Sequence, residues 1–295
     1  MNEIIINILT SKKYELLSEG YNSKSYKIKI NSKDYTLLQG RISDSYQCYQ
    51  NSYKNLVFLY NNGNPLIKSL QVPFNGIKLL EPDNNNEFLE NGGLIYEEIK
   101  GLILYEKYFD KINKEKIANK LYLFLDELYS IKISTTDMEK AKYKIIHEFQ
   151  DDIKVIKEYF NNNKIDNNIN KFEKEFLEYI NNFNEFHYIH GDLWQENMII
   201  SEDYQDLVGI VDFDNFSIGD IAKDYAALVD LGQDFIDNLI EKNIKNIKNR
   251  EDFIKRIKIY EKKIEIEDFS YILRNNNLKW RLNSKLERLK NLNLI

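Results

Sequence analysis

The distribution of proline and glycine divides this sequence into two parts. All three prolines (Pro65, Pro73 and Pro82) and six of the eleven glycines lie in the first 93 residues. Short apolar segments lie between these turn-forming residues, a spacing that predicts β-strands joined by turns. After Gly101 the apolar residues recur with a helical period. We therefore predict an α+β chain that begins with a small sheet and continues mainly as helix.

Within the first part, four segments predict the strands of one antiparallel sheet: residues 26–30, 35–38, 76–80 and 94–99. The first two form a hairpin, and residues 44–62 are expected to form the only helix of this part. In the second part, short apolar runs interrupt the helices at 187–213 and predict strands around a loop. We expect two lobes, an N-terminal one at 1–98 and a larger helical one at 99–295.

Composition excludes several classes of protein. Cys48 is the single cysteine, so a disulfide framework and a cysteine metal cluster are excluded. A net charge of -6 disfavours a generic nucleic-acid binder. The first residues lack the basic start of a signal peptide, and no apolar run approaches the roughly 18 residues of a membrane span. We expect a cytoplasmic, soluble protein without nucleic-acid or membrane partners.

The most informative segment for chemistry begins at His190-Gly191-Asp192 and includes Asn197, and Asp212 follows after an apolar run. Phosphoryl transfer needs a carboxylate near the accepting hydroxyl and oxygen ligands for the Mg²⁺ on the nucleotide phosphates. An Asp and an Asn five residues apart on one loop, with a further Asp at a neighbouring strand end, can supply these groups. The spacing therefore predicts a phosphotransferase site.

This segment, together with Gly219-Asp220 and Asp224, resembles the catalytic core of the aminoglycoside phosphotransferase and choline kinase superfamily, relatives of the protein kinases. The resemblance implies a two-lobed protein-kinase-like fold, ATP or GTP as phosphoryl donor, Mg²⁺, and an aminoglycoside-like or choline-like acceptor. It implies that Asp192 is the catalytic base and that Asn197 and Asp212 are metal ligands. Asp220 and Asp224 are expected to have structural roles.

The N-terminal part resembles the nucleotide-binding lobe of this superfamily. Residues 16–26 are similar to its phosphate loop, a likeness that points to three nucleotide-binding residues: Gly20, Asn22 and Lys24. Residues 94–101 resemble the hinge whose backbone binds the nucleobase, which implies contacts at Glu97 and Ile99.

The third strand departs from the family pattern. Gln39 stands where the family has a Lys or Arg that contacts phosphate and pairs with a helix Glu. The helix at 44–62 has no Glu, and Asn55 falls at the partner position. Losing both charges avoids leaving one buried and uncompensated. We keep Gln39 among the expected nucleotide contacts, and we expect Lys24 or Arg41 to contact phosphate in place of the missing cation.

The distribution of charge suggests the nature of the acceptor. Residues 185–240 contain thirteen Asp or Glu residues and one lysine, whereas residues 241–295 contain fifteen Lys or Arg residues and eight acidic ones. A negative field around the catalytic loop favours a cationic acceptor. The alternative to an enzyme is a pseudokinase or spore-coat-type binding protein of the same fold. A protein kinase is disfavoured, because residues 215–219 leave no room for an activation segment.

Overall fold

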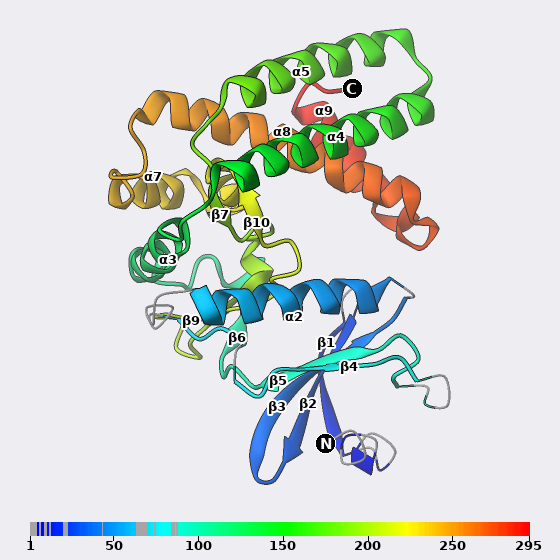
Figure 1. The fold of residues 1–295 in the computed structure, drawn as a ribbon, viewed down its shortest axis with the longest axis vertical. Helices are drawn as coiled ribbons and strands as arrows, with labels where there is room; N and C mark the ends of the chain where they lie inside the picture. The colour runs from blue at the N-terminus through cyan, green and yellow to red at the C-terminus, as the bar shows by residue number, and fades with distance from the viewer. Residues whose placement is uncertain are drawn as a thin grey trace. The chain divides into compact units, whose positions relative to one another are not determined.

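The computed structural model describes residues 5, 7–8, 11, 13–19, 23–42, 44–62, 70–73, 75–83, 86 and 88–295. The chain forms two compact units (Figure 1). Unit 1 comprises residues 1–131 and 190–216, and unit 2 comprises residues 132–189 and 217–295. The lobe boundary between residues 98 and 99 is a different division of the chain, and it stays a prediction.

Unit 1 contains a five-stranded antiparallel sheet with strand order β1-β2-β3-β5-β4. Its elements are β1 (Tyr14–Glu19), β2 (Ser23–Ile30), β3 (Lys33–Gly40), β4 (Lys78–Leu80), β5 (Gly93–Glu97) and the helix α2 (Ser45–Asn62). Asn31 and Ser32 turn the predicted hairpin between β2 and β3, and both have positive φ angles, 49° and 67°. Two-residue hairpin turns favour such left-handed residues. The four predicted strands and the helix are confirmed, and β1 is a fifth strand that was not among them.

The two faces of this sheet bury different partners, because successive side chains of a strand point to opposite sides. On one face, Ile28 and Leu37 belong to a buried cluster. On the other face, Leu38 and Tyr96 pack together with Tyr49 of α2. Figure 1 shows α2 running across the sheet. Each face of the sheet therefore carries its own buried apolar cluster, and α2 packs on only one of the two faces.

A second, three-stranded sheet of unit 1 has the order β6-β8-β9. Its strands are β6 (Leu102–Ile103), β8 (Met198–Ile200) and β9 (Leu207–Ile210), and the nearby helices are η1 (Glu106–Tyr108), α3 (Lys114–Tyr129) and η2 (Gln195–Asn197). Segments far apart in the sequence thus meet here, since β6 pairs with β8. The pairing brings the end of the hinge segment beside the predicted catalytic segment.

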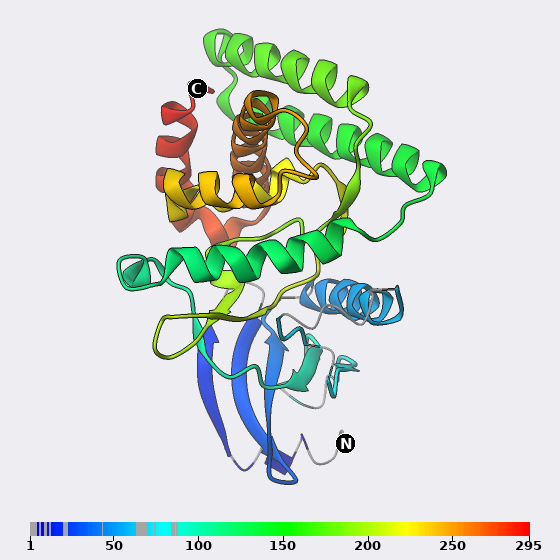
Figure 2. The ribbon, with the colours of Figure 1, turned by 90° about the vertical axis from the view of Figure 1, so that its left-hand side faces the viewer.

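Unit 2 is mainly helical (Figures 1 and 2). Its elements are α4 (Thr135–Phe160), α5 (Asn163–Asn182), β7 (His187–Ile189), β10 (Ser217–Gly219), α6 (Ala222–Ala226), η3 (Val229–Leu231), α7 (Gln233–Lys242), α8 (Arg250–Arg274), η4 (Asn276–Arg281) and α9 (Leu282–Asn291). Asn161 ends α4 in the left-handed conformation, and the Asn162 side chain accepts from the first N–H groups of α5. These asparagines close the α4–α5 turn.

An aromatic cluster fills the interior between α4, α5 and α8. The rings of Phe149 and Phe176 lie 4.4 Å apart, and Tyr260 meets Phe176 edge to face. Each large buried side chain contributes about 1.5–3 kcal/mol of hydrophobic free energy. The predicted two-lobed fold class, with a small antiparallel sheet and a mainly helical part, is confirmed. In the described part of the chain, every helix is too short or too polar to span a bilayer.

Candidate active site

The predicted catalytic and metal-binding residues Asp192, Asn197 and Asp212 lie in residues 190–216 of unit 1. The strands that flank this segment, β7 and β10, pair antiparallel. Gly191 has a φ of 81°, and a Cβ at this position would lie 2.2 Å from the backbone oxygen of Asn215. No residue with a side chain fits there without a shift. The Gly191 backbone therefore brings Asp192 close to the Asp212–Asp214 segment.

Asp192 and Asn197 are linked directly, as their spacing predicts. The Asn197 amide nitrogen donates to the Asp192 backbone oxygen at 2.7 Å and lies 3.4 Å from its carboxylate. The backbone oxygen of Asn197 accepts from Val211 N–H at 3.0 Å. The amide nitrogen orients the loop, while the oxygen on the other branch of the same group is the atom suited to a metal ion.

His190 stabilises the loop that contains Asp192 and Asn197. Its side chain is fully buried, and its Nε2 donates to the Val211 backbone oxygen at 3.1 Å. Burial lowers the pKa of His190 to about 4, although hydrogen bonds with the Val211 and Asp192 backbone act in the opposite direction. The imidazole is therefore neutral near pH 7 and connects the end of β9 with the catalytic loop.

Asp212 adopts a strained backbone conformation, with a φ of 67°. A non-glycine residue in the left-handed region costs about 1–3 kcal/mol and persists only where the surroundings enforce it. The Phe213 ring lies 4.7 Å from the His190 ring and is fully buried. This anchor fixes the turn that presents Asp212.

Three carboxylates meet at this turn. Oxygens of Asp192, Asp212 and Asp214 lie within 4.8 Å of one another. Solvent reaches the Asp212 side chain, yet the protein atoms crowded around its carboxyl raise its pKa well above the usual value, and the charges of Asp214 and Asp192 raise it further. Clustered oxygen donors are the ligands that Mg²⁺ prefers. The donor set therefore fits a divalent cation, which would relieve the repulsion.

Two contacts from α2 were not foreseen. Asn55 Nδ2 donates to the Phe213 backbone oxygen at 2.7 Å, and the Cys48 thiol is hydrogen-bonded to the Asp214 carboxylate. Burial is the main cause that raises the pKa of Cys48, which reaches about 11. The negative charge of Asp214 is the second cause and acts in the same direction. The seven-residue spacing of Cys48 and Asn55 places them on one helix face, a signal that the sequence carries.

The structure places Gln39 on the side of β3 that faces away from α2, the helix that carries Asn55. Leu38 faces α2, so the alternation of β3 turns Gln39 to the other side, where Lys24 is its cross-strand neighbour. On the helix side, Ser23 is hydrogen-bonded to Tyr49. Adjacent Leu37 and Leu38 are both apolar, which concealed the orientation of the strand.

The cations proposed as substitutes bind an acidic neighbour. Lys24 Nζ lies 3.5 Å and an Arg41 guanidinium nitrogen 3.0 Å from Glu19 Oε1. Nucleotide contacts by Lys24 and Gln39 stay predictions. Gly20 and Asn22 lie outside the described residues.

The predicted hinge, residues 94–101, begins within β5 and continues past its end. The Glu97 carboxylate accepts from Lys33 Nζ at 2.9 Å, and the Glu97 backbone N–H donates to Asn75 O at 2.8 Å. The Glu98 backbone N–H donates to Asp34 O at 3.0 Å. These bonds fix the strand end, and nucleobase contacts by the Glu97 and Ile99 backbone stay predictions.

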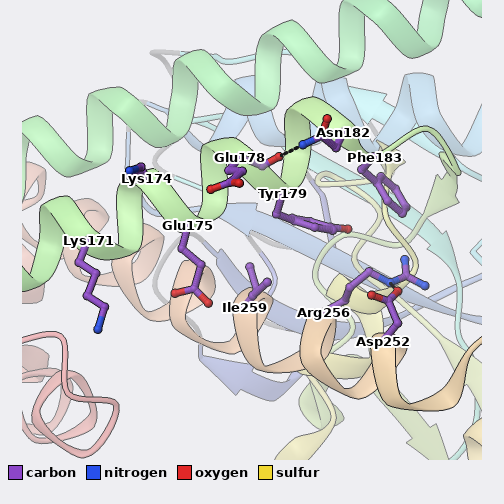
Figure 3. Close-up of a pocket in the computed structure, with 10 residues that line it drawn as sticks. All are labelled: Lys171, Lys174, Glu175, Glu178, Tyr179, Asn182, Phe183, Asp252, Arg256 and Ile259. Carbon is purple, nitrogen blue, oxygen red and sulfur yellow. Dashed lines mark hydrogen bonds and ion pairs between the residues drawn. The ribbon is translucent and has the colours of Figure 1, made fainter.

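Asp220 lies in unit 2 and is fully buried. Arg256 donates to its Oδ1 at 2.6 Å, Tyr179 O–H donates to Oδ2, and Ala222 N–H donates at 3.0 Å. Tyr179 and Arg256 also line an open cavity of about 610 Å³ between α5 and α8 (Figure 3). This network supports the expected structural role of Asp220. Asp224 is likewise fully buried.

The basic C-terminal region neutralises part of the acidic stretch. Four acidic residues of 185–240 form ion pairs with it: Glu185 with Lys248, Asp220 with Arg256, Asp230 with Arg288, and Asp237 with Arg250. The negative field that favoured a cationic acceptor is therefore weaker than the residue count implies.

Comparison with known proteins supports the same class. Residues 136–246 match the family model described as the phosphotransferase enzyme family, APH. A comparison with curated proteins gives no match.

Solved structures of aminoglycoside phosphotransferases share the fold. A GDP and kanamycin complex of APH(2")-IIia is 16% identical, with a TM-score of 0.74 and 99% of each chain covered. ADP-bound APH(2'')-Ib is 19% identical, with a TM-score of 0.67, and covers 97% of this chain and 96% of its own. A thermostable mutant of APH(4)-Ia with ADP and hygromycin B is 13% identical, with a TM-score of 0.65. The match covers 98% of this chain and 97% of the APH(4)-Ia chain.

At these identities the structural likeness establishes the fold. The fold and the family model together confirm the resemblance to the aminoglycoside phosphotransferase and choline kinase superfamily. The family model supports a phosphotransferase.

Proposed function

We propose that the protein transfers the γ-phosphoryl group of ATP or GTP to a hydroxyl of a small molecule. The observation that carries this proposal is the grouping of the Asp192, Asp212 and Asp214 carboxylates within 4.8 Å, with Asn197 hydrogen-bonded to Asp192. A base and oxygen ligands at such distances are what phosphoryl transfer requires.

In the proposed mechanism, the Asp192 carboxylate accepts the proton of the acceptor hydroxyl as that oxygen bonds to the γ-phosphorus. The bond between this phosphorus and the β–γ bridging oxygen breaks, and ADP or GDP leaves. Asn197 and Asp212 would hold Mg²⁺, which supplies charge neutralisation on the nucleotide phosphates. His190, neutral and buried, keeps the loop in place through Val211 O. The 1–98 segment is the proposed nucleotide-binding lobe, with contacts from Gly20, Asn22, Lys24, Gln39 and the backbone of Glu97 and Ile99.

The proposed acceptor is an aminoglycoside-like or choline-like alcohol, and a cationic one is favoured. Related structures that contain kanamycin or hygromycin B with a nucleotide support this class. One observation favours a second candidate, a pseudokinase or binding protein: the β3 residue that faces α2 is Leu38, an apolar residue.

Thermal shift with ATP and GTP, each with and without Mg²⁺, tests the proposal first. We expect one nucleotide to raise the melting temperature more with Mg²⁺ than without it. Nucleotide consumption with amino sugars, choline-like amines and neutral or anionic alcohols, at two salt concentrations, then identifies the acceptor. Binding without turnover on any acceptor would favour the pseudokinase. Absence of nucleotide binding would refute the phosphotransferase and leave a binding protein of the same fold.

A further inference from the structure

Helix α2 reaches the Asp212 turn through donors on a single face. Asn55 Nδ2 lies 2.7 Å from Phe213 O and 3.4 Å from Asp214 O, and the Cys48 thiol bonds to the Asp214 carboxylate. Seven residues are close to two helical turns, so Cys48 and Asn55 project in the same direction. The helix therefore contacts this turn at two separate points.

The turn depends on such contacts. The left-handed Asp212 backbone is unfavourable by itself and needs neighbours that hold the following peptide. The Phe213 ring is fixed between His190 at 4.7 Å and Phe124 at 6.3 Å, both centroid distances. Asn55 fixes the backbone oxygen of the same residue from the helix side. Side chain and backbone of Phe213 are thus held independently.

We propose that Asn55 is a positioning residue for the metal site. Its amide holds the Phe213 carbonyl and thereby sets the direction of the Asp212 carboxylate. The inference rests on the proposed function, in which Asp212 binds Mg²⁺. It also explains why an amide stands here: backbone carbonyls only accept hydrogen bonds, so a Glu or Asp at position 55 would face them with acceptors alone.

Asn55→Asp is the decisive substitution, because it keeps the shape and replaces the donor with a carboxylate. Asn51→Asp is the matched control on the same helix, since Asn51 is exposed and accepts from Gln47 Nε2 at 3.0 Å, a bond that an aspartate retains. Binding of Mn²⁺ to the full chain, followed by electron paramagnetic resonance with and without ADP, is the readout.

We expect Asn55→Asp to raise the half-saturating Mn²⁺ concentration roughly 10- to 100-fold, the scale of an unsatisfied buried acceptor. Asn51→Asp is expected to stay within about twofold of the wild type, as surface substitutions do. ADP affinity without metal should change little in both variants. A merely structural role would instead weaken metal-free and metal-dependent binding together.

Asn55→Ala removes the donor without adding charge and carries the test if Asn55→Asp does not fold. Wild-type Mn²⁺ affinity in a folded Asn55 variant would overturn the inference and leave the proposed function intact. Failure of both variants to fold would assign Asn55 to general stability and overturn it as well. If the wild type binds neither Mn²⁺ nor the Mg²⁺-nucleotide, the proposed function fails, and the inference fails with it.

Discussion

Crowded carboxylates occur in both units, but their neighbours differ. In unit 1, the protein atoms crowded around its carboxyl raise the pKa of Asp212, and the like charges of Asp214 and Asp192 raise it further. In unit 2, burial also acts to raise the pKa of Glu267, yet the charges of Lys223 and Lys263 prevail and lower it to about 2. The charged form of Asp212 is thus disfavoured, and the charged form of Glu267 is favoured.

This difference distinguishes a site from a scaffold. Unit 2 supplies its carboxylates with cations, such as Arg256 for Asp220 at 2.6 Å and Lys285 for Glu265 at 2.9 Å. Unit 1 brings three carboxylates within 4.8 Å of one another. Strongly perturbed groups gathered in one place are typical of functional sites, where a ligand completes the charge balance.

The largest effect is expected from Asp192→Asn. The substitution keeps the shape of the side chain and removes its ability to accept a proton, so turnover should fall roughly 10²- to 10⁴-fold. Nucleotide affinity, measured by calorimetry, should be retained. Asp234→Asn, at an exposed position of α7, is the control and should retain activity. Equal turnover by Asp192→Asn would contradict the assignment of the base.

In unit 2 the corresponding test is Arg256→Met. It leaves the buried Asp220 without its guanidinium, and removing one partner of a buried pair costs about 3–5 kcal/mol. Arg250→Met breaks the ion pair of Arg250 with Asp237. The Arg250 side chain is 53% exposed, so this substitution should cost less than about 1 kcal/mol. Urea unfolding of both variants measures the difference. Equal losses would show that burial of the pair does not matter.

Glu267→Gln tests the pH dependence of unit 2. The folded-state pKa of about 2 lies below the usual 4.5, so the stabilisation is complete above pH 4.5 and is lost as the pH falls through 2. We expect the variant to be about 2 kcal/mol less stable at pH 7, and about half of that difference to be gone by pH 3. Urea unfolding at pH 7, 5 and 3 checks this, with the exposed Glu175→Gln as control. A pH-independent difference would exclude the charge effect.

The smallest effect has the opposite sign. Asp214→Asn removes one charge from the unit 1 cluster, so without metal the protein should become about 1 kcal/mol more stable, as relief of a strained site often does. The melting temperature should rise by about 2–4 °C. With Mn²⁺ present, the wild type should gain more than the variant. A lower melting temperature of the metal-free variant would show that the cluster is not repulsive.

The sequence was sufficient to predict which residues lie close together where those residues are near one another along the chain. The motif from His190 to Asn197 lies between β7 and β8, and Asp212 follows two residues after β9, which pairs with β8, so their proximity follows from short-range spacing. Strand alternation and the polar residues 31–34 likewise predicted the hairpin, which turns at Asn31 and Ser32. Their catalytic and metal-binding roles stay predictions.

Long-range partners were not predictable in the same way. Asn55 and Phe213 are separated by 158 residues, so nothing in the local pattern of α2 identifies the carbonyl that it binds. The orientation of β3 was concealed because Leu37 and Leu38 are both apolar. The pairing of Asp220 with Arg256 spans 36 residues, and charge counts alone could not show which acids are neutralised.

The division of the chain has a consequence for its synthesis. Unit 1 is complete only after residues 190–216 have been synthesised. The aromatic cluster of α4 and α5 is complete only after Tyr260 of α8 has been synthesised. At roughly 5–20 residues per second, the interval between translation of Phe176 and of Tyr260 is on the order of ten seconds. During that time the apolar faces of α4 and α5 are on a nascent chain without the helix that covers them, so this hairpin completes its packing only after α8 has been translated.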